Sequence, residues 1–216
     1  MNMSCTIRLA SFAFVCILAT GTALPAQARV HGFRAQRNGS TAGHVGGTVG
    51  NGQGGLAHFR GSRVSGPRGT AAHGSVTSAN PDGSISHRGG TRITGSNGGS
   101  FTGSNNYTRN ADGSAQGSFQ RSGNNATTGA SYGSSGNYSR DSSGNWNASR
   151  QTTTSGTRGS YAGSTAASNG TATHDSTITN AAGDTYTGQT GYTRGQGVTH
   201  TGSCTDPSGH TIPCQH

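Results

Sequence analysis

Large apolar side chains are sparse along this chain, and beyond its start they occur singly among polar residues. The one sustained apolar run covers 12 residues, Leu9 to Thr20. Of the 188 residues after position 28, only 22 are Val, Ile, Leu, Phe, Tyr or Trp. Glycine-rich breaks recur roughly every 12 to 15 residues, a spacing typical of short strands joined by tight turns. The pattern predicts an all-β chain, a repetitive antiparallel hairpin meander of short polar strands.

Residues 1–28 have the three parts of a secretory signal peptide. Arg8 gives a positive start, the apolar run is too short to cross a bilayer as a helix, and Ala26-Gln27-Ala28 places small residues where the peptidase reads them. We predict cleavage after Ala28 and export to the periplasm, the outer surface or the extracellular space. A short amino-terminal membrane anchor is the alternative interpretation.

One four-residue motif, Asn or Asp followed by two residues and then Gly, marks five of the turns. The Asn or Asp side chain bonds the backbone two residues on, and Gly accepts the left-handed φ at the end. This is typical of a three-residue hairpin loop, a type I turn closed by a glycine bulge. The five copies begin and end at Asn80 and Gly83, Asn110 and Gly113, Asp141 and Gly144, Asn180 and Gly183, and Asp206 and Gly209.

The turn at 180–184 predicts the register of its own hairpin. An apolar pair falls on one face and two threonine pairs fall on the other, as a half-buried hairpin requires. The expected pairs are Ile178 with Tyr186, Thr179 with Thr185, and Thr177 with Thr187. The same rule at 141–145 places Arg140 opposite Trp146, where a cation–π contact is expected. Residues 129–137 lack a clean turn, and no register is predicted there.

Composition divides the part after Ala28 into two regions. Residues 29–92 hold eight arginines and five histidines among paired glycines, which favours a flexible Gly/Arg/His-rich region. Residues 93–216 carry the regular turns and are expected to form a β-hairpin repeat region. The five histidines either stack as a loose column or were duplicated with the repeat, and the second interpretation is favoured because no carboxylate accompanies them. They are His31, His44, His58, His73 and His87.

Two cysteines, Cys204 and Cys214, remain after the signal, because Cys5 and Cys16 lie within it. A pair in an exported chain predicts one disulfide, closed around the last turn. The turn rule pairs Cys204 with Ile212, so the two cysteines are diagonal and a bridge requires local twist or a shifted register. A metal pair with the neighbouring histidines is the alternative.

No enzyme is expected, because the side chains that hydrolysis and group transfer need are missing. The chain has six Asp and no Glu, and five of the Asp lie in or beside turns. Asp175 follows His174, but serine is so common that a triad there carries no weight. We assign no catalytic residue, no cofactor and no metal. With 39 Gly and so few apolar residues, the composition also excludes a helical bundle, an α/β enzyme and a membrane protein.

The formal net charge is +9, and every basic side chain apart from histidine is Arg. Such a chain can bind anionic polymers such as envelope polysaccharide, lipid head groups or extracellular DNA. The alternative is that the charge solubilises a polar sheet, and the absence of adjacent basic residues favours it. Nucleic acid is for the same reason not the expected partner.

The Asn-x-Asp-Gly turns, the segment 197–204 and Pro213-Cys214 resemble those of uncharacterised exported repeat proteins of Gram-negative bacteria. These proteins are rich in Gly, Ser, Thr and Asn and end in a Cys-bounded hairpin. The resemblance is loose over residues 80–216 and closer over the last 20. It implies export and a repetitive β structure, and it implies no activity.

Two other analogies are weaker. Ice-binding proteins share the Thr-x-Thr dipeptide spacing but have coils of constant length. Curli-type fibre subunits have regularly spaced amide ladders, whereas the glutamines here follow no fixed period. They are Gln116, Gln120, Gln151 and Gln189.

We therefore expect an exported non-enzymatic structural protein, associated with the cell surface or matrix. The alternative is a cationic binder of anionic polymers. Strands without lysine have poorly guarded edges, so self-association through strand edges is expected. Anionic polysaccharide or a lipid surface is a second expected partner, and no small-molecule substrate is expected.

Overall fold

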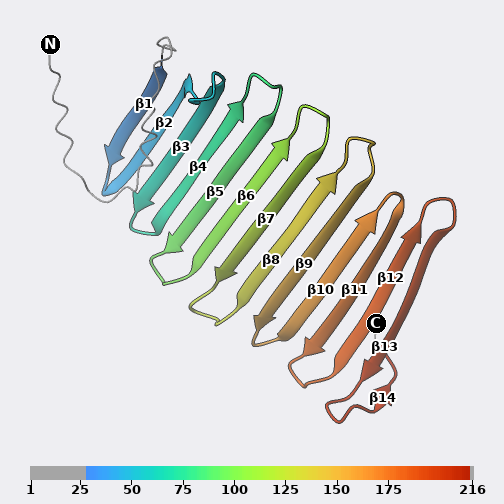
Figure 1. The fold of residues 1–216 in the computed structure, drawn as a ribbon. Helices are drawn as coiled ribbons and strands as arrows, with labels where there is room; N and C mark the ends of the chain where they lie inside the picture. Colours follow the sequence, from blue (N-terminus) through green and yellow to red (C-terminus); the bar gives the residue numbers. More distant parts are fainter. Residues whose placement is uncertain (1–27, 215–216) are drawn as a thin grey trace, which may run out of the picture.

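The fold was obtained as a computed structural model, which describes residues 28–214. The predicted signal peptide up to Gln27 therefore lies outside the described residues. Within this range the chain forms fourteen strands in one sheet, and each strand pairs with its sequence neighbours (Figure 1). The all-β antiparallel meander is confirmed. The strands are β1 (Arg29–Arg37), β2 (Ser40–Gly50), β3 (Leu56–Gly66), β4 (Gly69–Ala79), β5 (Ile85–Gly95), β6 (Ser100–Arg109), β7 (Ala115–Asn124), β8 (Ser131–Arg140), β9 (Trp146–Gly156), β10 (Gly159–Ser168), β11 (Thr171–Asn180), β12 (Thr185–Thr193), β13 (Gly197–Thr205) and β14 (Thr211–Ile212).

All five predicted Asn/Asp turns join consecutive strands. In each, the glycine N–H donates to the carbonyl oxygen of the first residue at 3.0–3.1 Å, and the glycine φ lies between 83° and 94°. Three of these turns follow β4, β6 and β8, and two follow β11 and β13. Because antiparallel strands alternate in direction, the first three lie at one end of the sheet and the other two at the opposite end.

The predicted hairpin registers are also confirmed. Ile178 pairs with Tyr186, and threonine pairs flank them on the other face. Arg140 lies opposite Trp146. The cation–π contact that the structure shows among residues 28–214 lies elsewhere, on β7, where the Arg121 guanidinium carbon is 5.3 Å from the ring centroid of Phe119, two residues before it.

The sheet is a single layer with almost no core. Among residues 28–214, only Ala57 and Ala115 are buried apolar residues, and no large side chain is fully buried. Backbone pairing and cross-strand side-chain pairs therefore hold the fold together. Aromatic rings add to this by covering glycines. A Cβ added to Gly136 would lie 2.6 Å from a ring carbon of Phe119.

Residues 29–92 depart from the expectation of a flexible region, because they form β1 to β4 and most of β5. Their glycines meet one another across the sheet, as in the pairs of Gly74 with Gly61 and with Gly90. Polar side chains also pair, and Thr77 and His87 hydrogen-bond at 2.8 Å. A sheet without a core needs no particular density of apolar residues.

The stretch 129–137, for which no register was predicted, begins in a loop and continues as β8. The loop spans 125–130, and its Asn125 side-chain oxygen accepts the N–H groups of Thr127 and Thr128 at 3.0 and 3.2 Å. The Asn125 N–H donates to the Ala130 carbonyl at 2.8 Å. A longer asparagine-stabilised loop thus replaces the usual turn and returns the chain to antiparallel pairing with β7.

The predicted disulfide joins Cys204 and Cys214, whose Cα atoms are 5.3 Å apart. Cys204 pairs with Ile212, as the turn rule requires. Cys214 lies beyond the end of β14, where the chain has left the strand register, so the bridge forms without a shift of that register. Both sulfur atoms are used in this bond, which removes the alternative of a metal pair.

Candidate functional site: the two faces of the sheet

One line of side chains runs across every strand and is mostly apolar. Its members are successive register partners, so they project from the same face of the sheet. We call this line the apolar row and the face that carries it the aromatic face. The row consists of Ala35, Ala42, Val64, Ala71, Ile93, Phe101, Gly123, Tyr132, Thr154, Tyr161, Ile178, Tyr186, Cys204 and Ile212.

On each strand, one residue adjacent in sequence to the member of the apolar row projects from the opposite face, which we call the polar face. These adjacent residues form a second line across the sheet. Every member is an alcohol or an amide, and we call this line the hydroxyl row. Neighbours bond across the strands, for example Ser131 with Ser155 at 2.7 Å and Thr179 with Thr185 at 3.2 Å. The row consists of Gln36, Thr41, Ser65, Thr70, Thr94, Ser100, Asn124, Ser131, Ser155, Ser160, Thr179, Thr185, Thr205 and Thr211.

Aromatic residues are segregated in the same way. Of the eleven Phe, Tyr and Trp side chains in the described range, ten project from the aromatic face, and Phe59 is the exception. The ten are Phe33, Phe101, Tyr107, Phe119, Tyr132, Tyr138, Trp146, Tyr161, Tyr186 and Tyr192.

Histidines share this face too. All seven histidines in β1–β13 project from it, but they do not form a column, because His31 pairs with Gly46 whereas His44 pairs with Phe33. Five of them bond through Nδ1 to the hydroxyl of the threonine directly opposite, at 2.8–3.2 Å. These pairs are Thr48 with His58, His73 with Thr91, Thr77 with His87, Thr165 with His174, and Thr190 with His200. His174 and Asp175 project from opposite faces, which removes the one candidate triad.

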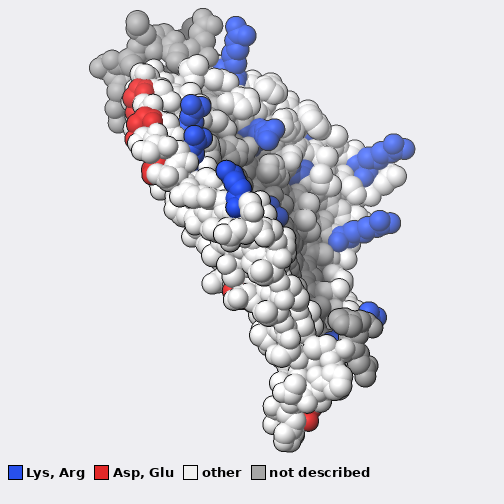
Figure 2. Space-filling model, turned by 90° about the vertical axis from the view of Figure 1, so that its right-hand side faces the viewer, with Lys and Arg blue, Asp and Glu red and all other residues white. Residues whose placement is uncertain are grey.

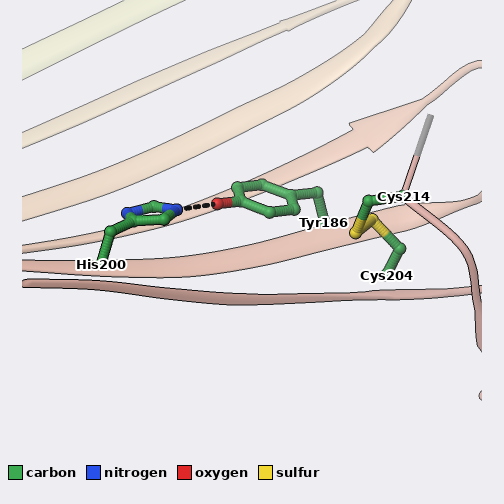
Figure 3. The surroundings of a disulfide bond; sticks show 4 residues. All are labelled: Tyr186, His200, Cys204 and Cys214. Atoms are coloured by element: carbon green, nitrogen blue, oxygen red, sulfur yellow. Dashed lines mark hydrogen bonds between the residues drawn. A yellow bond between two sulfur atoms is a disulfide. The ribbon is translucent and has the colours of Figure 1, made fainter. Parts of the chain in front are cut away.

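In two of these Thr–His pairs, a tyrosine hydroxyl also contacts the histidine ring. The hydroxyl of Tyr186 lies 2.9 Å from Nε2 of His200, beside the disulfide of Cys204 (Figure 3). The hydroxyl of Tyr161 lies 3.4 Å from Nε2 of His174. Each tyrosine ring extends along its own strand over a glycine two residues on, and a Cβ there would lie within 2.1–2.3 Å of the hydroxyl. The Tyr-x-Gly spacing thus permits a repeated Thr–His–Tyr cluster.

Charge is distributed unevenly between the faces. Within β1–β13 the aromatic face carries seven arginines and no acidic residue. They are Arg29, Arg37, Arg60, Arg109, Arg121, Arg140 and Arg150. The polar face carries Arg34, Arg63, Arg88 and Arg92 together with Asp175. Figure 2 shows arginines projecting well beyond a surface that is otherwise largely uncharged.

Acidic residues other than Asp175 lie in the turns, where their partners explain them. The Ser84 hydroxyl and N–H lower the pKa of Asp82, and those of Ser114 lower the pKa of Asp112. The Asn145 side chain, with backbone N–H groups, lowers the pKa of Asp141. These carboxylates stabilise turns at one end of the sheet and leave the faces free of negative charge there.

A shallow depression of about 440 Å³ lies on the aromatic face over β6 to β10. Tyr107 and Tyr138 stand two strands apart in one row, and Gly117 between them provides the low floor. Phe119 and Arg150 line the next row. Arg150 Nε donates to the hydroxyls of neighbouring residues on β8 and β9 at 3.3 and 3.2 Å, which orients its guanidinium group.

Comparisons with protein-family models, with curated proteins and with solved structures find no match to this chain. In residues 28–214, no group of three or more His, Cys, Asp or Glu is placed to hold a metal ion. The same residues contain no helix long and apolar enough to cross a membrane. Function therefore has to be inferred from the chemistry of the two faces and the edges.

One row of glutamines on the polar face was not predicted from the sequence. Gln120, Gln151 and Gln189 belong to one row of the polar face, on β7, β9 and β12, although their sequence spacings differ. Gln189 donates to Asp175 at 2.7 Å. The segregation of faces was missed for the same reason, because each loop has its own length. Register partners share a face, so whether odd- or even-numbered residues of the next strand lie on that face depends on whether the number of residues between partners is odd or even. The sequence gives this number, which is the available signal, for single hairpins only.

Proposed function

We propose that the mature chain is an exported, non-enzymatic structural protein of the cell surface or extracellular matrix, which assembles by pairing strand edges. The observation that carries this proposal is the single-layer sheet with a free edge on each side. All nine residues of β1 are exposed. At the other side, the first seven residues of β13 are exposed as well. Edge strands present unpaired N–H and C=O groups that a further strand can satisfy.

The two edges are not equivalent. β1 carries Arg29, Arg34 and Arg37 within nine residues, and charged side chains discourage edge pairing. β13 has no Lys, Arg, Asp or Glu. β14 covers only Cys204 and Thr205 of β13, so the stretch from Gly197 to Ser203 remains open. The open part of β13 is therefore the edge that favours assembly.

Strand direction then indicates the symmetry. β1 and β13 run in the same direction because the strands alternate, so joining copies head to tail would create a parallel pair. Two β13 strands related by a two-fold axis pair antiparallel, which is the slightly more stable arrangement. Such an axis is perpendicular to the sheet and keeps each face continuous across both copies. The proposed unit is thus a dimer with one extended aromatic face and one extended polar face.

A structural role agrees with the placement of the reactive side chains. Five of the six aspartates have their carboxylates bound within the turns they stabilise, and the histidines of five cross-strand pairs are bonded to threonine. Export agrees with the disulfide, which is typical of oxidising compartments. It agrees also with β1, whose first residue is Arg29, directly after the proposed cleavage site. Mass spectrometry of the exported protein is expected to find Arg29 first; an intact Met1 would contradict export with cleavage.

Sedimentation of the chain from Arg29 onward, at increasing concentration, tests the assembly. We expect a dimer that Thr201→Lys weakens, because this substitution places a charge on the open edge. Thr153→Lys is the matched control, since Thr153 lies on the same face of interior strand β9. A chain that stays monomeric at all concentrations, or an equal effect of both substitutions, contradicts edge pairing through β13.

A further inference from the structure

The aromatic face is uncovered in the fold. Twelve large apolar side chains are exposed among residues 28–214, and ten of them belong to this face. Tyr107, Tyr138 and Tyr192 of one row expose 39%, 36% and 45% of their surface. Tyr107 and Tyr138 line the depression over β6 to β10, and contiguous exposed apolar surface of this kind marks a place that contacts something else.

A second copy packed face to face does not fit the charges. The seven arginines of the aromatic face would meet the same seven arginines without any acidic partner. Like charges in contact are costly, whereas an anionic partner would be attracted. Charge complementarity therefore selects a negatively charged occupant.

The orientation of the aromatic rings indicates the shape of that occupant. The Phe119 ring covers Gly136, and the Tyr107 ring lies against Gly117, so these rings are folded down over the sheet. They form a flat, open platform instead of a slot between stacked walls. The ring face carries partial negative charge and attracts the C–H groups of a sugar ring. Consecutive sugar rings of an extended polysaccharide can lie on such a platform without being splayed.

The spacing of the arginines separates the two polyanions of interest. In duplex DNA each strand carries a phosphate about every 3.4 Å along the helix axis. Arg121 on β7 and Arg150 on β9 are two strands apart, which is about 10 Å or more. Carboxylates that recur once in one or more sugar units match this sparse spacing better. Asn105 and Thr165 line the same depression and can bond sugar hydroxyls.

We propose that the aromatic face over β6 to β10 binds an extended acidic polysaccharide that runs across the strands. Tyr107 and Tyr138 contact the faces of the sugar rings, and Phe119 supports the Arg121 guanidinium that lies over its ring. Arg121 and Arg150 donate charge-assisted hydrogen bonds to the carboxylates. The site is complete in one copy of the chain, so it does not depend on edge pairing.

Affinity electrophoresis of the mature chain tests the site with three probes. They are alginate as an acidic polysaccharide, pullulan as a neutral one and a thymidine oligonucleotide as a nucleic acid. We expect retardation by alginate that weakens with salt, and little retardation by pullulan. Equal retardation by pullulan, or tighter binding of the oligonucleotide than of alginate, overturns the proposal.

Two double variants localise the binding. Arg121→Gln with Arg150→Gln is expected to weaken alginate binding by at least about tenfold, because each substitution removes a charge-assisted hydrogen bond. Arg34→Gln with Arg92→Gln removes the same charge from the polar face and is expected to change binding much less. An equal loss in both variants would show that net charge alone binds the polymer and would overturn the site. Circular dichroism of each variant confirms that it is folded.

Discussion

The hydroxyl of Tyr186 lies 2.9 Å from Nε2 of His200 on the adjacent strand, and the tyrosine ring covers the buried Gly188 to reach it. Thr190 bonds the other nitrogen of the same imidazole ring at 2.8 Å. In a sheet without a core, such contacts replace the packing that a second layer would provide. Glycine in these strands is therefore a packing surface as well as a source of backbone freedom.

The first prediction concerns that contact. A Cβ at Gly188 would lie 2.3 Å from the Tyr186 hydroxyl, so Gly188→Ala must lift the ring and break the bond to His200. We expect the free energy of unfolding to fall by about 1 kcal/mol, the net value of one hydrogen bond. Thermal or denaturant unfolding measures this.

Gly90→Ala is the matched control for this substitution. A Cβ added to Gly90 would have a backbone carbonyl oxygen as its nearest neighbour, at 3.6 Å, which is an ordinary contact. The φ of Gly90 is not left-handed. Here alanine is expected to leave stability unchanged or to raise it by about 0.4 to 1 kcal/mol, because the unfolded chain loses freedom. Equal destabilisation by both substitutions would contradict a packing role of the Tyr186 ring.

The second prediction concerns the stability of the fold at acidic pH. The pKa of Asp112 is lowered from 3.8 because the Ser114 hydroxyl and N–H donate to its carboxylate. This stabilisation is fully present above pH 3.8 and is lost as the pH falls below it toward the depressed value. Asp82 and Asp141 act in the same direction. We expect the melting temperature to fall as the pH decreases from about 5 to about 2.

Asp112→Asn isolates the contribution of this turn. The amide oxygen can still accept from Ser114, but the side chain no longer titrates. The variant is expected to show a smaller loss of melting temperature over the same acidic range. A pH profile identical to that of the unmodified chain would mean that Asp112 does not couple folding to protonation.

The third prediction concerns the disulfide. The Cys204–Cys214 bond holds β14 against the end of β13, and its ring of about 11 residues contributes roughly 2 to 3 kcal/mol by loop closure. Cys204→Ser with Cys214→Ser is expected to free the rest of the β13 edge and to increase self-association in sedimentation. Ser208→Ala in the same exposed turn is the control. Two titratable thiols in the unreduced, unfolded chain would show that the bond does not form.

The fourth prediction concerns residues 29–92. Because β2 to β5 are paired on both sides, their amide protons are expected to exchange as slowly as those of β6 to β12. β1 is paired on one side only, so about half of its amides are expected to exchange quickly. Exchange at random-coil rates over 29–92, with protection elsewhere, would restore the interpretation of a flexible region.

Local structure was accessible from the sequence because short-range chemistry decides it. An Asn or Asp followed by Gly three residues later bends the chain in the same way wherever it occurs, as at Asn180 and Asp206. The turn then determines the register of its own hairpin, so the pairing of Ile178 with Tyr186 and of Cys204 with Ile212 followed directly. The sparse apolar residues likewise determined that no ordinary core could form.

Only the tertiary structure decided how separate hairpins align. A row across fourteen strands depends on the sum of all loop lengths, and an error of one residue moves every later side chain to the opposite face. This is why the shared row of Gln120, Gln151 and Gln189 was invisible in their sequence spacing. The gathering of aromatic, histidine and arginine side chains on one face, opposite a face of alcohols and amides, arises from the same accumulated register.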